Sequence, residues 1–158
     1  FLRSLGLSTS TLMAFYCLGT TMTSCGSETD DPDPVVPGGG GSGITGTTTG
    51  SAINFTVDLT NSTYATLKTA GQFKIIGDVL VAFTTGSAYV ALAKACTHEG
   101  TQLQYVSAKN NLFCSNHGSQ FSTTGAVQNG PTIGGTIVAL KAYKTSLSAD
   151  GNTLTVTV

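Results

Sequence analysis

Two short segments that combine cysteine and histidine constrain this chain more than any other feature of its sequence. They read Cys96-Thr97-His98-Glu99-Gly100-Thr101 and Cys114-Ser115-Asn116-His117-Gly118-Ser119. The chain has only two histidines, and each follows a cysteine by two or three positions. Four such side chains in two short loops are suited to hold a metal. A fold that uses them must bring the two loops together.

The order of the ligands favours one kind of metal centre. A zinc finger usually pairs cysteine with cysteine and histidine with histidine, whereas each segment here carries one of each. That pattern suits a [2Fe-2S] cluster in which the cysteines hold one iron and the histidines the other. Three alternatives remain open at this point. They are a structural zinc site, a Cys96–Cys114 disulfide that leaves both histidines unexplained, and two unrelated surface histidines.

At these residues the sequence resembles the Rieske family. The two segments look like its cluster-binding loops, Gly130-Pro131 looks like its third, proline-containing loop, and the likeness extends from about residue 53 to 158. The resemblance implies buried cysteines and surface histidines, through which electrons would enter and leave. It also implies a [2Fe-2S] cluster bound by Cys96, His98, Cys114 and His117.

The resemblance also bears on the reduction potential. High-potential Rieske proteins have a disulfide between two further cysteines, and Thr101 and Asn116 stand at those positions. Ser119 stands where such proteins have a serine that hydrogen-bonds a bridging sulfide, and Phe121 stands where they have a tyrosine. We therefore expect a potential below that of the quinol-oxidising members and near or above that of the low-potential ferredoxin-type members.

The amino-terminal part is expected to direct export. Residues 1–24 carry one cation, Arg3, before an uncharged and moderately apolar run, which is typical of a secretory signal. Met22-Thr23-Ser24-Cys25 resembles the lipobox of bacterial lipoproteins, which predicts lipidation of Cys25 and a place in the bacterial cell envelope. A retained, weak membrane anchor is the alternative interpretation.

Residues 25–51 are predicted to be a flexible linker. They contain four acidic residues and three prolines, followed by Gly38-Gly39-Gly40-Gly41 and a stretch rich in threonine and glycine. Such a composition offers little apolar surface to bury. A chain of this length would have a root-mean-square reach of about 30 Å.

The remainder, residues 52–158, is predicted to form one all-β domain, a small antiparallel sandwich or barrel with the metal-binding loops at one tip. Ile53–Leu59 alternates apolar and polar residues as a half-buried strand does. Further strands are expected in two hairpins that lead into Cys96 and Cys114, and in a closing pair. Their expected ranges are 79–84 with 88–93, 103–106 with 111–113, and 137–143 with 154–158.

These features favour one-electron transfer in the cell envelope by a membrane-tethered protein. Charged residues make up 9% of the chain and there is no basic patch, so nucleic acid is not an expected partner. The expected partners are redox proteins, and the protein is more a carrier than an enzyme by itself. Alternatives are a small subunit of a larger oxidoreductase, of the quinol–cytochrome or molybdenum type, and an envelope lipoprotein without redox function.

Overall fold

The structure is a computed structural model and describes residues 41–158. The predicted signal sequence, the lipobox with Cys25 and most of the predicted linker lie outside the described residues. Within them the all-β prediction is confirmed, with eleven strands and two short 3₁₀ helices, η1 (Ala65–Lys68) and η2 (Ser107–Lys109). The strands are β1 (Ile44–Thr47), β2 (Asn54–Asp58), β3 (Gln72–Ile76), β4 (Val79–Phe83), β5 (Tyr89–Ala93), β6 (Gln104–Val106), β7 (Asn111–Phe113), β8 (Gln120–Ser122), β9 (Val127–Asn129), β10 (Ala142–Leu147) and β11 (Thr153–Thr157).

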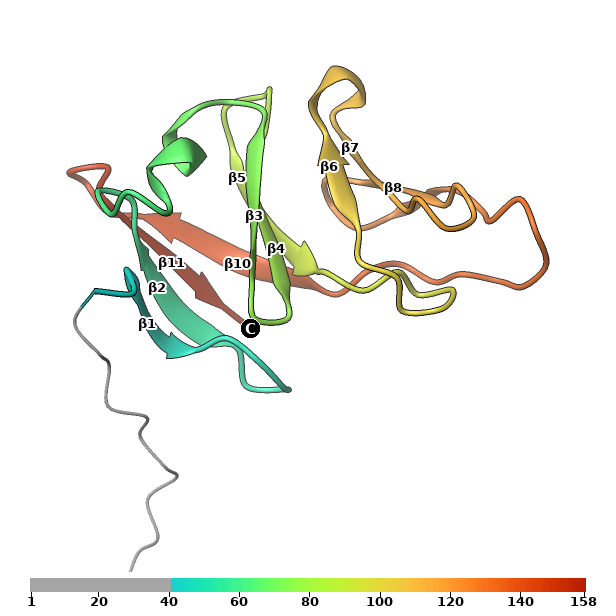
Figure 1. The fold of residues 1–158 in the computed structure, drawn as a ribbon, viewed down its shortest axis with the longest axis horizontal. Coiled ribbons are helices and arrows are strands. Elements are labelled where there is room, and N and C mark those ends of the chain that lie inside the picture. Colours follow the sequence, from blue (N-terminus) through green and yellow to red (C-terminus); the bar gives the residue numbers. More distant parts are fainter. Residues whose placement is uncertain (1–40) are drawn as a thin grey trace, which may run out of the picture. The chain divides into compact units, whose positions relative to one another are not determined.

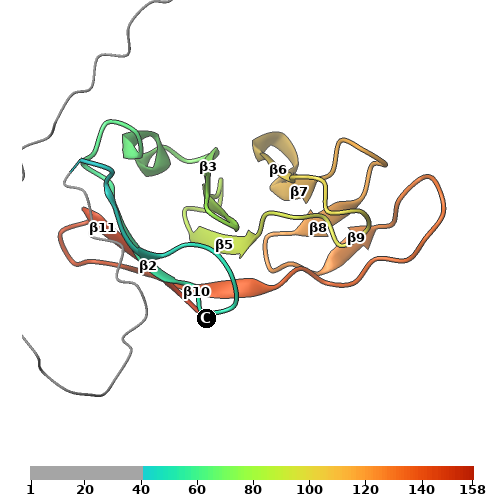
Figure 2. The ribbon, with the colours of Figure 1, turned by 60° about the horizontal axis from the view of Figure 1, so that its bottom comes forward.

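The strands form two antiparallel sheets. A seven-stranded sheet has the order β1-β2-β11-β10-β5-β4-β3, and a four-stranded sheet has the order β6-β7-β8-β9 (Figure 1). The chain leaves the larger sheet after β5, builds the smaller sheet, and returns to pair β10 with β5. The smaller sheet is thus an insertion between two neighbouring strands of the larger one (Figure 2). Residues 114–119, with the second pair of candidate ligands, connect its strands β7 and β8.

Strand β4 is buried on both faces because it lies between two apolar clusters. Val79 and Val81 pack into a cluster with β2 and β11, whereas Leu80 and Ala82 pack into a second cluster with the smaller sheet. Successive side chains of a strand point to opposite faces, so a strand covered on both sides has a continuous apolar run. The second cluster contains both cysteines, and the thiols are therefore part of the core that joins the two sheets.

The predicted linker ends earlier than expected. Strand β1 lies inside the range 25–51 and pairs with β2, with Ile44 opposite Val57. The amino-acid composition of this segment gave no sign of a strand, because β1 pairs with β2 through its backbone and most of its side chains are exposed. Gly46 has a φ of +112°, and a Cβ on it would lie 2.3 Å from the carbonyl oxygen of Asn54, so glycine is required at this crossing.

The first strand of the closing pair was also predicted in the wrong place. Residues 137–143 were expected to be a strand, but β10 runs over Ala142–Leu147. Ile137 instead packs against the second apolar cluster from an unpaired segment. Leu140 is buried there as well, whereas Val138 is 68% exposed, so an apolar run in the sequence indicated neither burial of every residue nor strand pairing. Like β1, strands β3, β8 and β9 were not predicted. Strands β2, β4, β5, β6, β7 and β11 lie within a residue or two of their expected ranges.

Candidate metal centre

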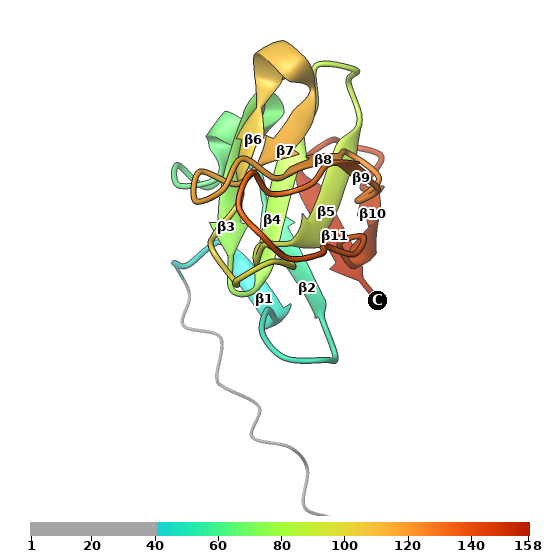
Figure 3. The ribbon, with the colours of Figure 1, turned by 90° about the vertical axis from the view of Figure 1, so that its right-hand side faces the viewer.

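Two loops carry the four candidate ligands, one after β5 and one between β7 and β8. Figure 3 shows the domain from the end at which these strands lead into the loops. The first follows β5 and is closed at its base by a bridge between Ala95 and Gln102. The second connects β7 to β8, which pair directly, with Phe113 opposite Gln120. Each loop is therefore held at both ends by β pairing, which limits how far its cysteine and histidine can move.

The two loops share one pattern of backbone hydrogen bonds. The Cys96 N–H donates to the Thr101 carbonyl at 2.8 Å, and the Gly100 N–H donates to the Cys96 carbonyl at 2.8 Å. In the second loop the Cys114 N–H donates to the Ser119 carbonyl at 2.9 Å, and the Gly118 N–H donates to the Cys114 carbonyl at 3.0 Å. Gly100 and Gly118 have φ values of +74° and +76°, which glycine adopts without strain. The glycine four residues after each cysteine thus closes the turn.

The two cysteines are buried and form no disulfide. Each is 2% exposed. Burial raises the pKa of the Cys96 thiol, and the neighbouring Cys114 thiol adds to the rise. The N–H of His98 and the nearby Ser119 hydroxyl act in the opposite direction. Two adjacent thiols thus lie in the apolar core without a covalent bridge between them, and a backbone N–H is directed at one of them.

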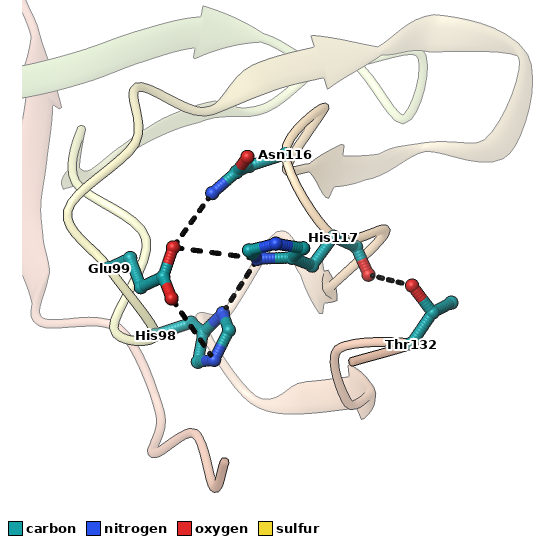
Figure 4. Close-up of polar contacts among 5 residues, drawn as sticks. All are labelled: His98, Glu99, Asn116, His117 and Thr132. Atoms are coloured by element: carbon teal, nitrogen blue, oxygen red, sulfur yellow. Dashed lines mark hydrogen bonds and ion pairs between the residues drawn. The ribbon is translucent and has the colours of Figure 1, made fainter. Parts of the chain in front are cut away.

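The side chains of the two histidines, His98 and His117, face each other. Their Nδ1 atoms lie 3.1 Å apart, and the rings meet edge to face at an interplanar angle of 73° (Figure 4). Two nitrogen ligands of one tetrahedral metal, at metal–nitrogen distances of about 2.0–2.1 Å, lie roughly 3.3 Å apart. The observed separation fits this value. The side chains of His98 and His117 are 11% and 19% exposed, so they are more accessible than the cysteines but not fully at the surface.

A third segment, residues 130–138, contacts both ligand loops. Thr132 donates from its N–H and its hydroxyl to the His117 carbonyl, at 2.8 and 3.1 Å. Thr97 exchanges hydrogen bonds with Val138, donating to its carbonyl at 2.8 Å and accepting from its N–H at 3.3 Å. The segment begins with Gly130 and Pro131, the predicted third loop, so the structure brings that loop to the histidines.

Sequence reasoning missed one charged residue of the site. The carboxylate of Glu99 accepts a hydrogen bond from Asn116 Nδ2 at 3.0 Å and lies 3.6 Å from His117 Nδ1. Its position directly after His98 was the only available signal, and that position alone does not say where the side chain goes. Thr97 and Thr132 were missed for the same reason, because their partners are distant in sequence.

Comparison with known proteins bears on the identity of this site. Residues 56–144 match the family described as Rieske [2Fe-2S] domain. The chain belongs to the Rieske family. It is 32% identical over 78 residues to the cytochrome b6-f complex iron-sulfur subunit of Chlorobaculum thiosulfatiphilum, covering 49% of this chain and 41% of that protein. The chain thus matches less than half the length of this relative. It is also similar to the plasma membrane Rieske protein PetC3 from Synechocystis PCC 6803, at 32% identity and a TM-score of 0.43, covering 51% of this chain and 76% of that structure.

A Rieske domain binds a [2Fe-2S] cluster, and such a cluster is a one-electron redox group. Two sulfur and two nitrogen ligands match the ligand set of a Rieske centre. One further observation supports the fit, since Ser119 is fully buried and its hydroxyl has no hydrogen-bond partner among the described residues. Buried hydroxyls rarely lack a partner, so an acceptor is expected next to it. Phe121, also fully buried, packs in the same cluster as both cysteines.

Proposed function

We propose that this protein is a one-electron carrier in which Cys96 and Cys114 hold one iron of the cluster and His98 and His117 hold the other. The observation that carries the proposal is the 3.1 Å approach of the two Nδ1 atoms, next to a pair of buried thiols that are not bridged. The thiols also pack in the apolar core, and the two Nδ1 atoms lie within hydrogen-bond distance of each other. It is the convergence of two thiols and two imidazoles on neighbouring loops that matches the ligand set of a Rieske centre.

The four side chains would have different roles because the cysteines are more deeply buried than the histidines. The thiols lie in the apolar core, where their sulfur atoms are shielded from water. The imidazoles are the more accessible ligands, and we propose that they form the edge at which electrons enter and leave. Held between β5, β7 and β8, the loops would change little between the two oxidation states. A small change in geometry favours rapid electron transfer.

We further propose that the domain is attached to a membrane of the bacterial cell envelope through a lipid on Cys25. The support is the Met22-Thr23-Ser24-Cys25 sequence and the signal-like run before it. Among the described residues no helix is long and apolar enough to cross a membrane. A lipidated cysteine with more than one acyl chain would hold the protein firmly, because a single chain binds membranes only marginally. The linker would let the domain meet soluble or membrane-bound redox proteins.

The experiment that tests the cluster is to purify the protein from iron-replete cells without exposing it to air. We expect two iron and two acid-labile sulfide per chain, and an electron paramagnetic resonance signal of mixed nitrogen and sulfur ligation after reduction. Replacing His98 by Cys should change that signal toward all-sulfur ligation if the cluster is retained. A protein that contained zinc, or a Cys96–Cys114 disulfide, would contradict the proposal.

A second candidate is a Rieske subunit of a larger membrane-associated oxidoreductase. It is favoured by the likeness to an iron-sulfur subunit of a cytochrome b6-f complex. The two candidates differ in their stable partners. Purification in mild detergent would give cytochrome-containing partners in fixed ratio if the protein is a subunit, and the protein without such partners if it is a carrier.

A further inference from the structure

A second side-chain contact joins the two ligand loops beside the imidazole pair. Asn116 Nδ2 of the second loop donates to Glu99 Oε2 of the first loop at 3.0 Å (Figure 4). Glu99 follows one histidine in sequence and Asn116 precedes the other. The contact therefore connects the loops at the same level as the candidate ligands.

This contact places a negative charge against both imidazoles. The Glu99 carboxylate lies 3.6 Å from His117 Nδ1 and 4.0 Å from His98 Nε2. The Glu99 side chain is itself 55% exposed. An exposed glutamate has rotamer freedom to extend into water, and ordering it has an entropic cost. A charge-assisted hydrogen bond from a short, loop-fixed amide offsets that cost and keeps the carboxylate beside the rings.

In the described part of the chain, no lysine or arginine forms an ion pair with this carboxylate. The ion pairs of Glu99 are with the two histidines. Between residues 95 and 139 the only other charged side chain is Lys109, which lies in η2 between β6 and β7. The site thus has a single fixed negative charge directly at its most exposed ligands.

We propose that Asn116 is a positioning residue that holds Glu99 beside the histidines, and that the Glu99 charge lowers the reduction potential of the centre. The inference rests on the proposed ligand set. Reduction adds an electron close to an existing negative charge, and the Coulomb repulsion makes that addition less favourable. Because the carboxylate is more than half exposed, dissolved salt weakens the effect.

The test is a redox titration of the cluster-containing full chain at fixed neutral pH, at low and high ionic strength. The variants are Glu99→Gln, which removes the charge and keeps the shape, and Asn116→Ala, which keeps the charge and removes its anchor. Asp150→Asn is the matched control. It makes the same change in net charge in the turn between β10 and β11, where Asp150 Oδ1 accepts a hydrogen bond from the N–H of Asn152.

We expect Glu99→Gln to raise the midpoint potential, Asn116→Ala to raise it less, and Asp150→Asn to leave it close to the wild-type value. Added salt should raise the wild-type midpoint and leave that of Glu99→Gln nearly unchanged. A Glu99→Gln shift no larger than the Asp150→Asn shift would overturn the inference while leaving the cluster assignment intact. If the Glu99→Gln variant does not retain its cluster, the wild-type protein still provides a test. A wild-type midpoint potential that does not change with salt would also overturn the inference. Wild-type protein without a cluster would contradict the proposed function itself.

Discussion

Gly135 lies against the imidazole of His98. A Cβ at position 135 would be 2.8 Å from His98 Nε2 and 3.0 Å from Cδ2, closer than real side chains approach. The φ of Gly135 is +96°, which side-chain-bearing residues rarely adopt. Residue 135 belongs to the segment that covers the histidines, so its missing side chain sets how closely that segment approaches the His98 ring.

The first prediction concerns Gly135→Ala. The substitution should destabilise the protein by about 1–3 kcal/mol through backbone strain, and the collision should turn the His98 ring. Gly151→Ala is the matched control, because Gly151 has a φ of +70° but nothing within 4 Å of an added Cβ. Both variants should lower the melting temperature. Only Gly135→Ala should alter the electron paramagnetic resonance spectrum, and identical spectra would show that residue 135 does not restrain the ligand.

The second prediction concerns Phe121→Tyr. Phe121 is fully buried and packs with both cysteines, and it pairs across the sheet with Leu112. A hydroxyl that reaches a cysteine sulfur would stabilise the more negative reduced state, so the midpoint potential should rise. Without such a partner the buried hydroxyl would destabilise the protein by roughly 1–3 kcal/mol.

The control for this change is Phe55→Tyr. Phe55 is 1% exposed and belongs to the other apolar cluster, which contains no cysteine. The added hydroxyl should therefore lower the free energy of unfolding without moving the potential. An unchanged or lower midpoint for Phe121→Tyr would mean that the ring does not face the sulfur ligands.

The third prediction concerns acid stability and Asp78. Its carboxylate accepts a hydrogen bond from the Gly50 N–H at 3.0 Å and lies 3.1 Å from Lys94 Nζ. These contacts, the Gly50 bond first, hold the pKa of Asp78 below its ordinary value of 3.8. A carboxyl whose pKa is lower in the folded state contributes stability above its unfolded pKa and loses it as pH falls through the folded value.

We therefore expect the free energy of unfolding to decrease below about pH 4, and Asp78→Asn to reduce that decrease. The amide NMR signal of Gly50 should titrate with the carboxylate, which reports the pKa directly. Its midpoint should lie below the ordinary aspartate value. A midpoint at or above that value would contradict the hydrogen bond.

The sequence predicted the ends of the ligand loops well because several local signals agreed there. Apolar runs preceded Cys96 and Cys114, and glycine followed each histidine. Alternation located β2 for a similar reason, since one of its faces is buried. These features depend only on residues that are close together in the sequence, so they can be predicted from the sequence alone.

The parts that were missed depend on partners far along the chain. Strand β1 pairs through its backbone, and its side chains are mostly exposed. The Glu99–Asn116 contact joins residues seventeen positions apart, and the Thr97–Val138 contact joins residues forty-one apart. Polar residues in loops have many possible partners, and only the fold selects one. Composition and periodicity could therefore predict neither the edge strand β1 nor the side-chain contacts between the loops of the site.

The last prediction concerns Ser119→Ala. The Ser119 hydroxyl is fully buried and has no hydrogen-bond partner among the described residues. It lies near the Cys96 thiol, where it opposes the rise that burial causes in the pKa of that thiol. If it donates to a sulfur of the bound cluster, its removal should lower the midpoint potential and also the stability of the cluster-containing protein, by about 1.5–3 kcal/mol. If it has no acceptor there, removing an unpaired buried hydroxyl should leave the potential unchanged and increase the free energy of unfolding. Redox titration and chemical unfolding of the same samples separate these outcomes, because the two cases give stability changes of opposite sign. Ser119→Thr, which keeps the hydroxyl, should retain the wild-type potential if the added methyl is accommodated. We expect the first outcome because the Ser119 carbonyl accepts a hydrogen bond from the Cys114 N–H at 2.9 Å, which holds Ser119 in the loop of that sulfur ligand.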